Sequence, residues 1–316
     1  MRITAQLIDA TTDHHLWSER YDRPLKDIFA LQDEIVQRIV TTLRLQLTLW
    51  EQGLQQVRKR TDNLEAYDFY LRGREFLVRV QSETSKEANA QARQMFEKAL
   101  ELDPTYAEAY ALLSVTYFVD WFYLWNPTPQ VLEQFSELAR KAIALDDSLP
   151  LAHAVLSWAY LAKRQYDQAI AEAERAIALD PNLADAYRVL GINLAWAGRP
   201  EDGIEFIEKA MRLNPRYGPI YLMNLGWAYL EAGRCDEALV PLKRALPLIP
   251  NAVDLHWNFA ICYAELGREE EAQAEAAKIM RLNPNFSIAR VTPFLLYKDP
   301  AMLERTLSAL RKAGLK

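Results

Sequence analysis

The fold is decided by residues 150–217, which read PLAHAVLSWAYLAKRQYDQAIAEAERAIALDPNLADAYRVLGINLAWAGRPEDGIEFIEKAMRLNPRY. The stretch divides after Leu183 into two units of 34 residues, in which Pro181 aligns with Pro215. A fixed period of this length is typical of a repeat array, in which each unit buries its apolar face against its neighbours. We therefore expect the chain to be built from stacked copies of one small motif.

Each unit is predicted to hold two helices joined by a turn. In the second unit, apolar residues recur at intervals of three and four over residues 183–194 and 199–213, as on one face of a helix. Gly198 and Pro200 interrupt this pattern, because glycine commonly ends a helix and proline suits the first turn of the next one. Pro215 ends the second helix, since the residue before a proline is pushed out of the helical region.

Small residues predict where the two helices of a unit touch. Gly191 and Gly203 each stand where a larger side chain would hold the pair apart. Four consecutive units share this arrangement of small, apolar and aromatic positions. The matching residues are His153, Leu156, Ser157, Tyr160, Ala169, Ala173, Ala176 and Pro181; Tyr187, Leu190, Gly191, Leu194, Gly203, Ile207, Ala210 and Pro215; Leu225, Gly226, Tyr229, Ala238, Leu242, Ala245 and Pro250; and Phe259, Ala260, Tyr263, Ala272, Ala276 and Pro284. This set resembles the tetratricopeptide repeat, which implies an all-α fold, a right-handed superhelix of helix pairs (an α-solenoid).

Six repeats are predicted over residues 61–286. Their boundaries are about 61–106, 107–149, 150–183, 184–217, 218–252 and 253–286. The first has a lengthened first helix, and the second carries an insertion over residues 119–129. Residues 287–316 are predicted to end in a helix, 300–313, that caps the array, because a terminal repeat needs a polar outer face. Residues 286–297 show no clear pattern.

Residues 1–60 are predicted to form a short β-hairpin and a long helix. Residues 2–9 and 16–21 are rich in strand formers, and the turn-like segment between them holds His14 and His15, which favours a solvated turn over a metal site. Apolar residues at helical spacing continue from about 28 to about 59. Because a lone two-stranded hairpin is marginally stable in water, we expect it to pair across a homodimer or to stay loosely ordered.

A second resemblance covers both ends of the chain. It rests on ITAQLIDATTDHHLWSERYDRPLKDIFALQDEIVQRI at 3–39, AYDFYLRGRE at 66–75 and YKDPAMLERTLSALRKAGL at 297–315. These stretches are similar to the last hairpin, exit helix, linker repeat and C-terminal cap of bacterial signalling proteins with a TolB-like domain before their tetratricopeptide repeats. In that family an adenylate/guanylate cyclase domain or a winged-helix DNA-binding domain often comes first. The resemblance implies that residues 1–60 are the remnant of a TolB-like domain.

Composition and charge narrow the function classes. The 316 residues are 50% hydrophobic and 25% charged, and no stretch approaches the about eighteen consecutive apolar residues of a transmembrane helix. A net charge of -6 argues against a surface for nucleic acid or an anionic membrane. Cys235 and Cys262 have no partner spacing, which favours free thiols in a reducing compartment. We therefore expect a cytoplasmic protein with no nucleic-acid partner and no membrane partner.

The sequence carries no recognisable catalytic motif. It has no glycine-rich phosphate loop, no metal-spaced set of Cys and His, and no nucleophile motif. His153 and His256 fall at a packing position of their repeats, and the carboxylates of 269–271 open a helix, where they complement its dipole. We expect no enzyme activity, no cofactor and no metal.

The inner faces of the first helices are the candidate binding surface. In tetratricopeptide arrays these helices line a concave groove, and four of the eight tryptophans fall on that face. Two interpretations remain open: packing between neighbouring helices, or a groove for a peptide or partner helix, which the enrichment of Trp and Arg in binding hot spots favours. Arg188, Asn224 and Asn258 would be its polar anchors, but they do not form the dense lysine/asparagine clamp that grips C-terminal carboxylates. The candidate groove residues are Trp158, Arg188, Ile192, Trp196, Met223, Asn224, Trp227, Trp257, Asn258 and Ile261.

These patterns favour a non-catalytic scaffold for protein–protein interaction, the sensory or regulatory part of a bacterial signalling protein. Two alternatives stay open. The chain is a fragment of an adenylate/guanylate cyclase, or a fragment of a winged-helix transcriptional regulator, with the catalytic or DNA-binding domain outside this sequence.

Overall fold

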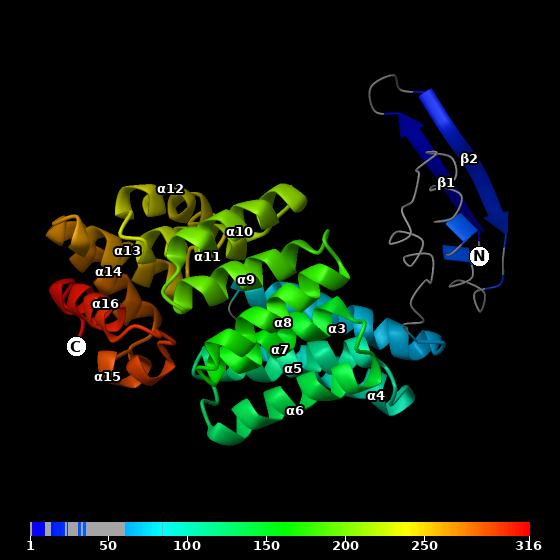
Figure 1. Ribbon diagram of the computed structural model, residues 1–316, viewed down its shortest axis with the longest axis horizontal. Coiled ribbons are helices and arrows are strands. Elements are labelled where there is room, and N and C mark those ends of the chain that lie inside the picture. Colours follow the sequence, from blue (N-terminus) through cyan, green and yellow to red (C-terminus); the bar gives the residue numbers. More distant parts are fainter. Residues whose placement is uncertain are drawn as a thin grey trace. The chain divides into compact units, whose positions relative to one another are not determined.

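The chain divides into two compact units in a computed structural model that describes residues 2–9, 14–22, 24, 31–32, 34–35, 61–83 and 85–316. The units are Met1–Leu64 and Glu65–Lys316. Among the described residues, the strands belong to the smaller unit, and the larger unit is built of helices (Figure 1). The two units are described separately below.

The N-terminal unit contains the predicted β-hairpin. β1 (Arg2–Asp9) and β2 (His14–Asp22) pair antiparallel along their length. The second strand begins two residues before its predicted start at Leu16, so the prediction that His14 and His15 lie in the turn is wrong. A bulge explains the difference, because the register shifts after Leu7 and strand pairing continues beyond the shift.

Only part of the predicted long helix lies among the described residues. Residues 31–32 and 34–35 are helical, and Leu31 is buried. The rest of the helix predicted over 28–59 lies outside the described residues. Tyr21 of β2 is also buried, and its ring centroid lies 6.5 Å from that of Trp17. In this unit, β2 and the helical residues thus each have one large side chain, Tyr21 and Leu31, that is buried.

The larger unit is a stack of helix pairs. The first helices are α3 (Leu64–Glu83), α5 (Ala107–Phe122), α7 (Pro150–Ala162), α9 (Ala184–Trp196), α11 (Pro219–Glu231) and α13 (Val253–Glu265). The second helices are α4 (Lys86–Leu102), α6 (Pro129–Leu145), α8 (Tyr166–Leu179), α10 (Pro200–Leu213), α12 (Cys235–Ala245) and α14 (Glu269–Leu282). From α5 to α13, each first helix also packs on the next first helix, which makes these helices one inner row. The predicted all-α superhelix is confirmed, and the residues at which the repeats begin and end stay a prediction.

Glycines set how closely the helices of a pair approach. A Cβ atom built on Gly191 of α9 would lie 2.6 Å from the backbone oxygen of Gly203 on α10, and the reverse distance is also 2.6 Å. Interiors are packed too closely to absorb such a contact, so a larger residue would push the helices apart. A Cβ atom on Gly226 of α11 would likewise meet the side chain of Leu242 at 2.6 Å. The prediction that small residues mark the helix contacts is confirmed.

The turn inside each repeat uses one backbone conformation. After α9, α11 and α13 the chain passes through Gly198, Gly233 and Gly267, with φ of 87°, 75° and 71°, in the left-handed region that glycine adopts readily. The corresponding residues after α5 and α7 are Leu124 and Arg164, with φ of 59° and 60°. This region costs a residue with a Cβ atom about 1–2 kcal/mol, so other contacts must hold Arg164 there.

The array ends in α16 (Pro300–Lys312), within one residue of the predicted capping helix. The Asp299 side chain caps it by accepting a hydrogen bond from the amide of Ala301 at 2.8 Å. Residues 286–297, which showed no clear pattern, contain α15 (Ile288–Val291), the 3₁₀ turn η2 (Thr292–Phe294) and an irregular stretch that follows.

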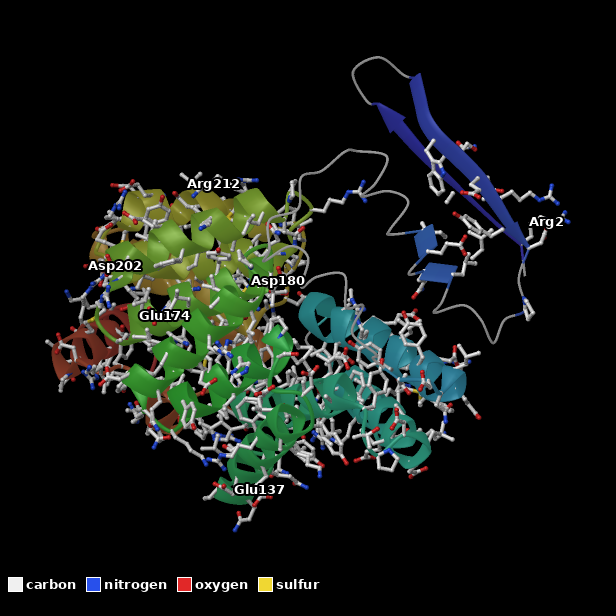
Figure 2. All side chains as sticks on the ribbon, turned by 45° about the vertical axis from the view of Figure 1, so that its right-hand side comes forward. Arg2, Glu137, Glu174, Asp180, Asp202 and Arg212 are labelled. Carbon is white, nitrogen blue, oxygen red and sulfur yellow. The ribbon has the colours of Figure 1, made fainter. Side chains whose placement is uncertain are left out.

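The second helices carry charged side chains on the outside of the array. Glu137 of α6, Glu174 of α8 and Arg212 of α10 are exposed examples (Figure 2). No helix among the described residues has the length and apolar character needed to span a membrane.

Candidate interaction surface

Aromatic side chains meet along the inner row of helices. Trp158 of α7 packs edge-on against Phe118 of α5, with ring centroids 4.5 Å apart. Trp196 of α9 and Trp227 of α11 also lie 4.5 Å apart. The structure thus brings three of the four predicted tryptophans into contacts between neighbouring repeats.

Arg188 of α9 links these helices. Its guanidinium lies over the rings of Trp158 and Tyr221, at 5.5 and 5.4 Å from their centroids. Nε donates to Oδ1 of Asp185 at 2.9 Å, and Nη1 donates to Oδ1 of Asn224 at 3.2 Å. Arg188 is only 7% exposed, so these partners hold it in one position. Two predicted polar anchors, Arg188 and Asn224, are therefore bonded to each other.

Asp185 stays ionised in this cluster. Desolvation by its neighbours opposes its charge, but the nearby charge of Arg188 and the hydrogen bonds from Arg188 and Tyr221 outweigh it and lower the pKa of Asp185, whose side chain is 56% exposed. The Tyr221 hydroxyl donates to Oδ1 of Asp185 at 3.0 Å. The charged pair of α9 thus bonds to α11 through Tyr221 and Asn224.

The C-terminal part of the chain crosses the inner row. We call residues 292–298 the strap. The Phe294 ring lies 5.1 Å from that of Trp121 on α5, and the Tyr297 ring meets that of Trp196 at 4.6 Å. The amide of Lys298 donates to the carbonyl of Trp196 at 3.0 Å. The strap therefore covers part of the predicted groove.

Side chains of the strap alternate between two apolar clusters. Phe294 and Leu296 pack with the cluster of the central repeats, which includes Ile192. Leu295 and Tyr297 pack with the cluster of the last repeats and α16. The chain leaves the 3₁₀ turn at Leu295, whose backbone is extended, and a period of two is that of an extended chain. Leu295, Leu296 and Tyr297 are each 9% exposed or less, so the middle of the strap is buried within the larger unit, whereas Pro293 and Lys298 are exposed.

Arg164 binds the strap backbone. Its guanidinium donates to the carbonyl oxygens of Pro293, Leu295 and Tyr297, at 3.3, 2.9 and 3.3 Å. Pro293 lies in the 3₁₀ turn, and Leu295 and Tyr297 lie in the irregular stretch after it. The guanidinium has five N–H donors in a fixed fork, so one side chain meets all three carbonyls. These bonds explain why an arginine occupies a turn position that is glycine in three other repeats.

A buried carboxyl group holds the end of the strap. The Tyr297 hydroxyl donates to Oε1 of Glu231 at 2.5 Å and lies 2.9 Å from Oγ1 of Thr306. Burial raises the pKa of Glu231 to about 7, although the hydrogen bond from Tyr297 and the charge of Arg305 favour its ionised form. Arg305 of α16 also donates to the Glu231 carbonyl at 3.1 Å and pairs with Glu265. We call Glu231, Tyr297 and Thr306 the latch, and its carboxyl group titrates near neutral pH.

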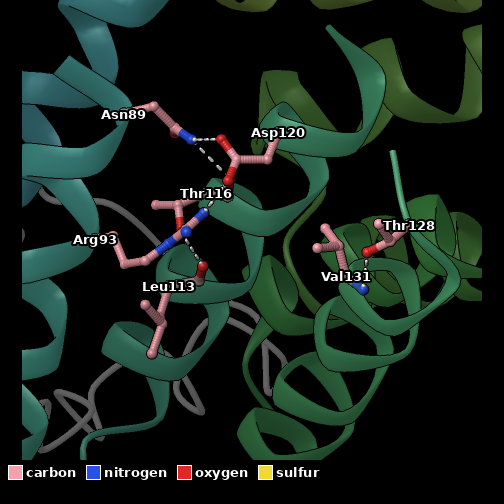
Figure 3. A network of polar contacts seen from close by, with 7 residues as sticks. All are labelled: Asn89, Arg93, Leu113, Thr116, Asp120, Thr128 and Val131. Carbon is pink, nitrogen blue, oxygen red and sulfur yellow. Dashed lines mark hydrogen bonds and ion pairs between the residues drawn. The ribbon is translucent and has the colours of Figure 1, made fainter. Parts of the chain in front are cut away.

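The predicted insertion at 119–129 is held in place by α4 (Figure 3). Side-chain nitrogens of Asn89 and Arg93 each donate to the carboxylate of Asp120 at 2.8 Å. The Asp120 carbonyl accepts from the amide of Trp125 at 2.9 Å. Because the start of the insertion is fixed in this way, it presents Trp121 to the strap.

The ten predicted groove residues fall into three places. Trp158, Arg188 and Asn224 form the Arg188 cluster, and Ile192, Trp196 and Trp227 pack in the cluster that receives Leu296. Met223, Trp257, Asn258 and Ile261 lie nearer the C-terminus, where Met223, Asn258 and Ile261 are buried and Trp257 meets Phe286 edge-on at 5.6 Å. That any of them binds a partner stays a prediction.

Sequence reasoning missed the strap and the residues that hold it, which are Arg164, Glu231, Phe294, Leu296, Tyr297 and Arg305. One signal was present in the sequence, since Arg164 stands where other repeats have glycine. The remaining residues have no local signal, because they meet partners far along the chain, such as Glu231 with Tyr297, 66 positions apart, and Trp121 with Phe294.

Both histidines of the array serve packing, as predicted. His153 and His256 each place Nδ1 2.6 Å from a second-helix glutamate, Glu172 or Glu275. Their Nε2 atoms lie 2.8 Å from a backbone carbonyl of the preceding turn. Within the ranges that the structure describes, no group of three or more His, Cys, Asp and Glu side chains could hold a metal ion.

Comparisons with known proteins agree with the repeat pattern. Three family models described as tetratricopeptide repeat match residues 150–183, 182–251 and 229–291. Over 170 residues, 54% of this chain, the sequence is 43% identical to the "Putative adenylate cyclase 3" of Rhizobium meliloti (strain 1021). The match spans only 28% of that relative.

Solved structures share the architecture. TTC0263, a tetratricopeptide repeat protein of Thermus thermophilus, aligns with 62% of this chain and 98% of its own at a TM-score of 0.50 and 22% identity. The APC/C hetero-tetramer Cut9-Hcn1 aligns with 90% of this chain and 54% of the matched chain at a TM-score of 0.56 and 17% identity. At such identities the likeness shows the fold alone. Residues 150–291 therefore contain tetratricopeptide repeats, in a chain that folds as a superhelix of stacked helix pairs.

Proposed function

We propose that this chain is a non-catalytic scaffold that binds a segment of another protein on the inner face of its array. The observation that carries the proposal is the row of aromatic side chains around Arg188 on α5, α7, α9 and α11. Trp, Tyr and Arg are the residues most enriched in binding hot spots. The hydrogen bonds of Arg188 support the proposal as well, because polar groups that are already positioned lose little entropy on binding.

The proposed role is that of a sensory or regulatory part of a bacterial signalling protein in the cytoplasm. The similarity to a protein named as an adenylate cyclase supports this role. Cut9 belongs to a hetero-tetramer with Hcn1, which supports assembly with other proteins as a use of the fold. In this proposal, residues 1–60 are a TolB-like remnant, 61–286 hold six repeats and 287–316 cap the array.

The cyclase relative also supports a second candidate, a piece of an adenylate/guanylate cyclase whose catalytic domain lies outside this sequence. A winged-helix regulator remains the third. In each case we expect the purified chain not to convert ATP or GTP into cyclic nucleotides with Mg²⁺ or Mn²⁺. Turnover that follows the chain through every purification step would overturn the non-catalytic proposal.

Photo-crosslinking in cells tests the scaffold itself. A photoreactive phenylalanine analogue replaces Trp257, which is half-buried in the inner row, and in a matched variant it replaces Val240, which is 62% exposed on α12. We expect a discrete protein adduct from position 257 and none from position 240. Equal labelling from both positions, or none from position 257, would contradict a binding role for the inner face.

A further inference from the structure

The strap occupies part of the surface that the proposed function requires. Its contacts are those by which proteins hold a bound peptide. Arg164 donates hydrogen bonds to the strap carbonyls, and the Trp196 carbonyl accepts one from the amide of Lys298. Alternate side chains of the strap pack in two apolar clusters. Main-chain hydrogen bonds with pockets for alternate side chains are a recurring mode of peptide recognition.

Arg164 indicates that carbonyl recognition is needed at this place. The turn itself needs only a residue that adopts positive φ, which is glycine in three repeats (Gly198, Gly233 and Gly267) and Leu124 in the repeat of α5. Backbone strain of this kind is often found at functional sites. Because the Arg164 bonds go to main-chain atoms, a segment of another sequence could satisfy them if its backbone follows the same path.

Both flanks of the strap have anchors of their own. α16 packs on α13, and Asp299 caps its first turn. On the other side, the amide of Ile288 in α15 donates to the carbonyl of Lys316 at 2.7 Å. None of these contacts involves residues 292–298, so the strap can leave the inner row without removing the anchors of α15 or α16.

We propose that the strap is an internal ligand, and that a partner binds this site with an extended segment of the same chemistry after the strap leaves. The segment carries apolar side chains at four consecutive positions, aromatic at the first and phenolic at the last, as in Phe294–Tyr297. The phenol reaches Glu231, which accepts a hydrogen bond from Tyr297 in the closed state. This inference rests on the proposed scaffold function and names the ligand class of its surface.

Because the strap is part of the same chain, it competes with any free peptide for this site. A segment held by short linkers has an effective concentration of roughly millimolar, so a free peptide meets a site that is almost always filled. The apparent affinity of the peptide falls in proportion to the fraction of open molecules. Weakening the strap alone should therefore strengthen peptide binding, whereas damage to the site should weaken it.

The probe is a fluorescent peptide of residues 291–299, VTPFLLYKD, with binding followed by anisotropy. Leu296→Ser weakens the strap of the full chain, and Leu248→Ser, at a side chain that is 55% exposed, is the matched control. We expect Leu296→Ser to bind the peptide at least about 10-fold more tightly than the unaltered chain or the control. Adding Arg164→Ala to Leu296→Ser should reverse that gain.

Equal binding by a folded Leu296→Ser variant and the control would overturn the proposal. Should Leu296→Ser fail to fold, hydrogen exchange of the unaltered chain decides. We expect the amides of Leu295 and Lys298 to exchange at least about 100-fold faster than those of α9, because the strap opens separately. Exchange at the α9 rate would identify the strap as permanent core. Either negative result leaves the crosslinks from position 257 unaffected, so failure here is distinguishable from failure of the scaffold function.

Discussion

The α9–α10 pair and the strap both bury apolar side chains in the array, but by opposite means. The pair closes through Gly191 and Gly203, where absent side chains let two backbones meet. The strap is held by added groups, the guanidinium of Arg164 and the carboxyl of Glu231. One contact joins successive helices, and the other joins Arg164 to Tyr297, 133 positions apart.

Because the two regions are held in different ways, we expect each to be destabilised without the other. Each repeat contacts chiefly its neighbours, so a seam depends on local shape alone. The strap needs several repeats to be in place at once, and its latch contains a group that titrates near neutral pH. Substitutions and pH should therefore distinguish them.

The largest effect we expect is a pH dependence that originates in the strap. Burial raises the pKa of Glu231 to about 7 from the ordinary value of 4.5. Its contribution to stability is thus fully present below about pH 4.5 and is lost as the pH rises through 7. The difference in pKa corresponds to roughly 3 kcal/mol at most. Denaturant unfolding between pH 5 and about 8 should show stability that falls with pH, and Glu231→Gln should remove most of that slope.

Glu275 provides the control for this slope. Burial opposes its charge, but hydrogen bonds from His256 and Lys278 lower the pKa of Glu275 below its ordinary value. Its contribution is present above the unfolded pKa and is lost as the pH falls through the folded one, which is the opposite sign in a more acidic range. Glu275→Gln should leave in place the fall in stability that Glu231 causes as the pH rises. An unchanged slope in Glu231→Gln would contradict the titration of the latch.

The second effect concerns the seam. Gly191→Leu should cost about 1–3 kcal/mol, because its Cβ atom would lie 2.6 Å from the backbone oxygen of Gly203. Denaturant melts measure the loss. Gly218→Leu is the control, since a Cβ atom there has no neighbour within 4 Å. Equal melts for the two variants would show that the seam tolerates bulk.

A smaller effect is expected where the inner row meets the strap. Trp227→Ala should cost about 1–2 kcal/mol, less than the roughly 3–5 kcal/mol of a fully buried tryptophan, because Trp227 is half-buried. The same melts compare it with Gly191→Leu. If Trp227→Ala is the more destabilising of the two, Trp227 belongs to the core and not to a binding surface.

The smallest effect on the array should follow deletion of residues 1–22. The hairpin belongs to the N-terminal unit, and the array has its own apolar clusters, so its helix content should not change. Circular dichroism measures this. Light scattering tests the proposed homodimer, because pairing of the strand edges of β1 and β2 across two chains would be lost with them. Collapse of helix content would show instead that the hairpin supports the array.

Much of the fold could be predicted from the sequence, because its signals are local. The turn at Gly198, the contact between Gly191 and Gly203 and the cap at Asp299 each depend on residues close by in the chain or one helix away. The start of β2 was missed, since a bulge breaks the alternation that marks a strand. The inner-row tryptophans were placed on the right helices, but their covering by the strap was not foreseen.

The sequence by itself determined the period, the helix pairs, the small residues at their seams and the hairpin, because repetition and helical spacing are written into neighbouring residues. Only the tertiary structure decided what lies on the inner row. Phe294, Leu296 and Tyr297 have no periodic partner, and their pockets exist only after the repeats from α5 to α11 have stacked. Contacts between residues so far apart depend on the curvature of the whole array, which no local pattern encodes.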